Sequence, residues 1–109
     1  MKTVRATIRW IKPDEGGRRH PPSGEGTIPY STIVRFLGEP WPPQTAWSLL
    51  VEKVRAVDPF TWDANIRFLF PEAPEDLLTL HKGFELYEGN KCVAHGAIES
   101  PALVANRRS

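Results

Sequence analysis

Apolar and polar residues alternate in the first part of the chain. Over residues 3–12, Val4, Ala6, Ile8 and Trp10 fall on one face, and charged or polar residues fall on the other. A period of two with β-branched residues is typical of a strand that has one buried side. The pattern predicts a first strand that ends before Pro13.

The same alternation predicts later strands. They lie at about 30–37, 64–70, 84–88 and 91–99. The last two are joined by the dipeptide Gly89-Asn90, and both of these residue types tolerate the positive φ angles of tight hairpin turns. Short strands with turn signals and no alternating helices indicate a closed barrel or a sandwich.

Residues 45–57 fit two patterns. A helical stripe is formed by Trp47, Leu50, Val51, Val54 and Val57, and a strand alternation over Leu49, Val51 and Lys53 is less regular. Periodicity alone favours a helix here.

Loops and composition set the domain organisation. At 109 residues, 40% apolar and 25% charged, the chain has the size and composition of one globular domain. We expect the domain to cover residues 1–100, with residues 101–109 as a disordered C-terminal tail. The stretch 13–29 contains four glycines and four prolines, and loops this long inside a domain are often functional.

Several classes are disfavoured by what the sequence lacks. There is one cysteine, so no disulfide forms within the chain. No apolar run approaches the roughly 20 residues that span a bilayer, and the N-terminus does not resemble a signal peptide. These features predict a cytoplasmic protein without a membrane partner.

The charges are divided unevenly. Residues 1–50 carry seven Lys/Arg against four Asp/Glu, and residues 51–109 carry seven against nine. Neither half has the strong basic excess of a dedicated nucleic-acid binder. Any contact with RNA would therefore be local.

One cationic cluster lies at the start of the glycine-rich loop. It consists of Lys12, Arg18, Arg19 and His20. Guanidinium groups and backbone amides on such a loop can bind a phosphate or a carboxylate. The alternative is a solvated loop whose arginines pair with acidic neighbours.

The remaining candidates are aromatic, histidine and cysteine side chains. Trp41, among prolines, and Trp62, in a predicted turn, are either exposed anchors for a partner or lids over a barrel end. His20, His81 and His95 match no metal-ligand spacing. Cys92 has no histidine motif beside it that would indicate a nucleophile. The sequence therefore predicts no metal, no cofactor and no catalytic site.

Two segments resemble the third, C-terminal domain of elongation factor Tu. The first is Asp14-Glu15-Gly16-Gly17-Arg18, which is followed by a loop rich in proline and glycine. The second is the hairpin at 84–98, in which Phe84, Glu88, Gly89, Val93 and Gly96 fall in register with the family. Between them, the segment 62–65 is similar to a turn that precedes a long strand of the family.

The resemblance implies a fold and a set of contacts. It implies a single six-stranded antiparallel β-barrel, with 47–54 as a strand. In the family, the corresponding surface contacts tRNA, and Arg18, Glu88 and Gly89 match it. The family histidine is displaced to His20 by Arg19, and a family glutamine is replaced by Tyr30. Lys91 adjoins the same turn.

The function expected from these observations is that of a non-enzymatic binding module. The sequence has no phosphate-binding loop of the P-loop type, so no nucleotide is expected. A protein partner, in translation or elsewhere, is the first expectation and tRNA the second; a homo-oligomer is also open. The alternatives are a regulatory, antitoxin-like or immunity-like protein on a translation-factor fold and, less favoured, a small hydrolase.

Overall fold

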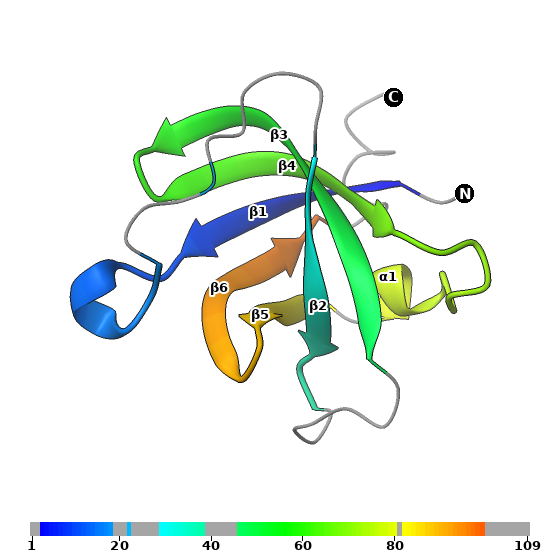
Figure 1. The fold of residues 1–109 in the computed structure, drawn as a ribbon. Coiled ribbons are helices and arrows are strands. Elements are labelled where there is room, and N and C mark those ends of the chain that lie inside the picture. The colour runs from blue at the N-terminus through cyan, green and yellow to red at the C-terminus, as the bar shows by residue number, and fades with distance from the viewer. Residues whose placement is uncertain (1–2, 19–21, 23–28, 39–45, 81, 100–109) are drawn as a thin grey trace.

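The described part of the chain contains six strands, one 3-10 helix and one short α-helix, arranged as Figure 1 shows. The computed structural model describes residues 3–18, 22, 29–38, 46–80 and 82–99. The elements in chain order are β1 (Val4–Trp10), η1 (Pro13–Glu15), β2 (Tyr30–Phe36), β3 (Trp47–Asp58), β4 (Thr61–Phe68), α1 (Leu77–Leu80), β5 (Gly83–Glu88) and β6 (Lys91–Ile98).

The strands form one closed barrel. Their order is β1-β4-β3-β2-β5-β6, and β6 pairs back with β1. All six pairings are antiparallel. Closure gives each strand a neighbour on both sides and removes the open sheet edges that favour association. The predicted six-stranded antiparallel barrel is confirmed.

The antiparallel order places the connections at two opposite ends. One end carries η1, the start of β2, the β3–β4 turn and the β5–β6 turn, and we call it the η1 end. Backbone hydrogen bonds close it, from Trp10 to Phe60 O at 2.8 Å and from Ile11 to Val93 O at 2.9 Å. α1 lies at the other end (Figure 1).

Apolar side chains fill the barrel. Ala6, Ile8 and Trp10 of β1 are buried, as their alternation predicted. Phe36 packs against two other rings, with centroid distances of 6.1 Å to Phe68 and 6.3 Å to Phe84. The interior is therefore a packed core, as in other small barrels whose side chains fill the lumen.

Residues 47–58 are a strand, and the helical stripe was misleading. β3 pairs with β2 on one side and with β4 on the other. Its register with β4 shifts between Lys53 and Arg55 and again between Ala56 and Asp58. Val54 and Val57 are the extra residues, and both are exposed. Two bulges thus interrupt the period of two and leave a spacing of three that imitates a helix.

Two predictions about β4 were wrong. Trp62 lies within the strand and not in a turn, and it is only 2% exposed. It is therefore part of the barrel core and not an exposed anchor. The strand was expected to extend to residue 70, but it ends at Phe68, and Phe70 is 50% exposed.

The β5–β6 turn is tight. Gly89 has a φ of +62°, and it is the only residue of the predicted Gly-Asn pair with a positive φ. A positive φ at the first central position alone is the pattern of a type II′ turn, which suits the twist of paired strands. Among the described residues, no helix is both long and apolar enough to cross a membrane. The predicted tail at 101–109 lies outside the described residues.

Candidate functional site

Three residues named from the sequence meet at the η1 end. Arg18 donates from Nη1 to Glu88 Oε2, and the Tyr30 hydroxyl donates to the same carboxylate oxygen. The Arg18 guanidinium also lies over the Tyr30 ring, 5.6 Å from its centroid. This cluster joins the loop after η1, the start of β2 and the β5–β6 turn, which are far apart in the sequence.

Two glycines direct the chain from η1 to Arg18. Gly16 has a φ of +92°, which glycine adopts at little cost. Gly17 is buried, and a Cβ added to it would lie 1.8 Å from the carbonyl oxygen of Ile11. Its amide donates to Lys12 O at 2.9 Å. The double glycine therefore lets the backbone fold back against the end of β1, so that Arg18 reaches the β5–β6 turn.

The cluster compensates its own charge. The side chains of Arg18 and Glu88 are 32% and 37% exposed. An ion pair that is partly exposed to solvent in this way fixes geometry more than it adds free energy. The positive charge of Arg18 is balanced by the negative charge of Glu88, with which it forms an ion pair. The Glu88 carboxylate also accepts the hydrogen bond from Tyr30.

Aromatic rings form the floor beneath Tyr30. Trp10 makes edge-to-face contacts with Tyr30, at a centroid distance of 5.3 Å, and with Trp62, at 4.9 Å. Lys53 Nζ lies 5.3 Å from the Trp62 ring centroid. These rings close the η1 end of the core. Of the two alternatives that the sequence offered for Trp62, the lid over a barrel end therefore matches its position.

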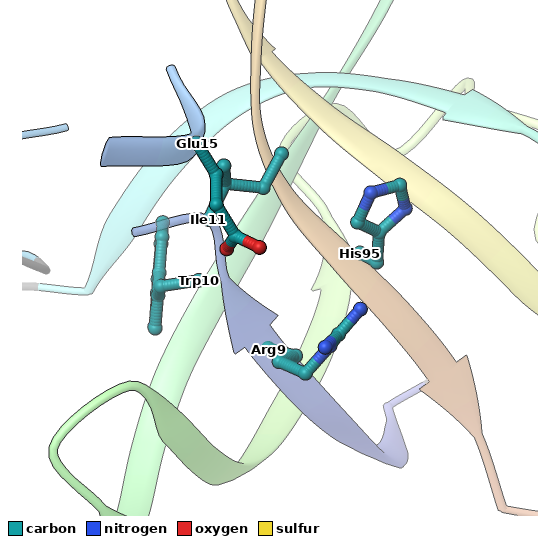
Figure 2. A pocket seen from close by; sticks show the side chains of 5 residues that line it. All are labelled: Arg9, Trp10, Ile11, Glu15 and His95. Atoms are coloured by element: carbon teal, nitrogen blue, oxygen red, sulfur yellow. The ribbon is translucent and has the colours of Figure 1, made fainter. Parts of the chain in front are cut away.

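A pocket of about 210 Å³ lies beside this floor, on the outside of β1. It is lined by Arg9, Trp10, Ile11, Glu15 and His95. In Figure 2, Glu15 and Trp10 lie on one side of it, and the Arg9 guanidinium and the His95 ring lie on the other. The pocket thus presents both signs of charge beside an aromatic wall.

A larger pocket of about 500 Å³ shares three of these residues and extends to the β3–β4 turn. Lys12 and Asp58 add one charge of each sign to it, and Phe60 adds an aromatic ring. Together the two pockets form an open, mixed-charge surface along the η1 end.

Sequence reasoning did not identify this surface. It placed Arg9 on the outer face of the first strand, but it could not show that Arg9 lies opposite His95 in the register of β1 and β6. Glu15 was considered as part of the segment that resembles the family and as a partner for an arginine, not as a residue that lines a pocket. The signal needed was the strand register, which no local pattern contains.

The other predicted residues divide into two groups. Lys12, Gly89 and Lys91 are exposed at the η1 end, close in the chain to the cluster or its turn. Arg19, His20 and Trp41 lie outside the described residues.

Tyr30 is expected to titrate at unusually high pH. Burial, followed by the hydrogen-bonded Glu88 carboxylate, raises the pKa of Tyr30 from 10.0 to about 12. The unfolded chain therefore loses this proton near pH 10.0 and the folded chain near pH 12. The contribution of Tyr30 to stability is intact below pH 10.0 and decreases between these two values.

The measurement is the phenolate absorbance of a Tyr87→Phe variant, in which Tyr30 is the only tyrosine, with circular dichroism to follow the fold. Glu88→Gln should lower the midpoint because it removes the adjacent negative charge. A midpoint near 10 in a chain that is still folded would contradict the described contacts.

No protein-family model and no curated protein matches the chain.

Proposed function

We propose that the protein is a non-enzymatic binding module that recognises a protein partner with its η1 end. The observation that carries the proposal is the cluster of Arg18, Tyr30 and Glu88. It joins the three segments to which the resemblance to the third domain of elongation factor Tu assigns contacts. The relation to that family is itself part of the proposal.

The charges favour a protein over tRNA. Arg18 is paired with Glu88, so its charge is not available without breaking that pair. Around it, the described charges have both signs and no strong excess of cations: the same end carries Arg9, Lys12, Lys53 and Lys91 together with Asp14, Glu15 and Asp58. A surface that binds phosphates needs a local excess of cations. Protein interfaces combine aromatic side chains with a polar rim, and the partly exposed Tyr30 and Phe60 lie at the same end as these mixed charges.

The first experiment is a titration of the protein against labelled bulk tRNA at low and at physiological salt. We expect weak binding at low salt that does not saturate at physiological salt. Steeply salt-dependent binding that is lost in an Arg18→Ala, Arg19→Ala variant would overturn the preference for a protein partner and assign the η1 end to RNA.

The second experiment tests the surface directly. Quantitative pull-downs from the source cell would compare wild type with Lys12→Glu, and the matched control is Lys82→Glu, an exposed lysine near α1 at the other end of the barrel. We expect a protein that is retained by wild type and by Lys82→Glu and lost with Lys12→Glu. A partner that is retained by Lys12→Glu but lost with Lys82→Glu would place the binding surface near α1 and contradict the proposal.

A further inference from the structure

The outer face of the β5–β6 hairpin gathers three side chains that can ligate a metal. They are Glu85, Cys92 and His95, and one candidate ligand atom from each lies within 4.8 Å of the other two. Glu85 Oε2 and His95 Nδ1 are 3.8 Å apart. None of the three belongs to the Arg18 cluster.

A β-bulge in β6 brings Cys92 and His95 to the same face. Residues three apart on a regular strand point to opposite faces. Here Leu86 pairs with Ala94 but Tyr87 pairs with Cys92, so Val93 is an extra residue. Val93 and Ala94 are consecutive and both are fully buried. The residues on either side of them, Cys92 and His95, therefore both face outward.

Glu85 is already oriented by its neighbours. Its Oε1 accepts hydrogen bonds from Arg35 Nε at 3.0 Å and from the Tyr87 hydroxyl at 3.0 Å. The other oxygen, Oε2, is the one nearer His95. Carboxylate ligands of protein metals are commonly held by such outer hydrogen bonds, which fix the carboxylate and leave one oxygen to bind.

We propose that Glu85, Cys92 and His95 form a binding site for a divalent transition-metal ion of the zinc type. A thiolate, an imidazole and a carboxylate are the ligand types that zinc uses, and three protein ligands leave the fourth tetrahedral position open. Binding replaces the thiol proton of Cys92 by a metal–sulfur bond and releases that proton to solvent. This proposal departs from the sequence expectation of no metal site and does not depend on the proposed function.

The site requires a modest closure. Zinc bonds of about 2.0–2.3 Å bring ligand atoms closer together than 4.8 Å. The His95 side chain is 46% exposed, so its ring has space to rotate toward the other two. It also lines the pocket beside Arg9 (Figure 2), which leaves the open position accessible to solvent. The positive charges of Arg9 and Arg35 lower the affinity, and we expect dissociation constants weaker than those of structural zinc sites.

The test is a titration of the full chain with Co²⁺ and Zn²⁺ after removal of metals by chelation, under reducing conditions. We expect one Co²⁺ per chain, tetrahedral cobalt bands and a thiolate-to-cobalt charge-transfer band. Because Cys92 is the only cysteine in the chain, that band reports on this site alone. Calorimetry with Zn²⁺ then gives the affinity.

Variants separate this site from other ligands. Cys92→Ser should abolish the charge-transfer band. Loss of an outer-sphere partner of a metal ligand weakens metal binding by at least about 10-fold. Because His95 and Glu85 are proposed as direct ligands, His95→Gln and Glu85→Gln should each weaken Zn²⁺ binding by at least this factor. A His20→Gln, His81→Gln double variant removes the other two histidines and should bind as wild type does. Circular dichroism verifies that each variant is folded. No charge-transfer band, or Zn²⁺ affinity that His95→Gln leaves unchanged, would overturn the proposal.

Discussion

Replacing Trp10 by alanine is expected to lower the free energy of unfolding by about 3–5 kcal/mol, the usual cost of truncating a large buried aromatic side chain. Trp10 is 2% exposed and packs against both Tyr30 and Trp62. Its loss opens the floor beneath the Arg18 cluster. Urea unfolding measures the global effect, and the alkaline titration of Tyr30 measures the local one. The Tyr30 midpoint should fall because burial is the main reason for its raised pKa.

Two controls make this result specific. Trp10→Phe retains an aromatic ring and should cost less than Trp10→Ala. Trp47→Ala removes a half-buried tryptophan that packs on Phe68 and pairs with Val34 on β2, away from the η1 end, so the Tyr30 midpoint should not change. A loss below about 1 kcal/mol for Trp10→Ala would mean that the barrel end is not closed as described.

Gly96→Ala is expected to destabilise the barrel by about 1–3 kcal/mol, as overpacking of a filled core does. Gly96 lies opposite Phe84 across β5 and β6. A Cβ at this position would lie 2.1 Å from Phe84 Cζ and 2.3 Å from Cε2. The Phe84 side chain is only 1% exposed, so its ring has little space into which it can move. Denaturant unfolding of the single variant gives the loss.

A double-mutant cycle tests the cause. Phe84→Leu removes part of the ring, so adding Gly96→Ala to it should cost less than Gly96→Ala costs in wild type. Ala97→Val adds apolar volume to the neighbouring exposed position and should be near neutral. If the two substitutions at 84 and 96 are additive, contact with the ring is not the reason for the glycine.

The strands that could be predicted were those in which alternation is unbroken. In β1, the side-chain pattern directly records which residues face the core, so Ala6, Ile8 and Trp10 were placed correctly. In β3, two bulges exposed Val54 and Val57 and disturbed that record. The resemblance, and not the local pattern, gave the right answer there.

The candidate site was predictable as a list of residues and not as an arrangement. Arg18, Tyr30 and Glu88 were each named from the sequence, but their shared carboxylate oxygen depends on how β2, β5 and the loop are brought together. No periodicity contains that information. The sequence identified the residue types, but only the arrangement of the strands shows that Arg18 forms an ion pair with Glu88.

The Glu85, Cys92 and His95 group was missed because the bulge in β6 was missed. Strict alternation places Cys92 and His95 on opposite faces, which rules out a shared ligand. The available signal was the pair of consecutive apolar residues, Val93 and Ala94, between them. Such a pair inside an alternating strand indicates a bulge, and a search for ligands should then allow for the change of face.

The pairing of β1 with β6 also affects the order of events during synthesis. Until residues 91–98 leave the ribosome, the remaining strands can form only an open sheet, whose edges are β1 and β5. Both edges then offer unpaired backbone groups to other nascent chains. These edges are covered only when β6 pairs with β1 and β5, so we expect association between nascent chains to decrease once that strand is in place.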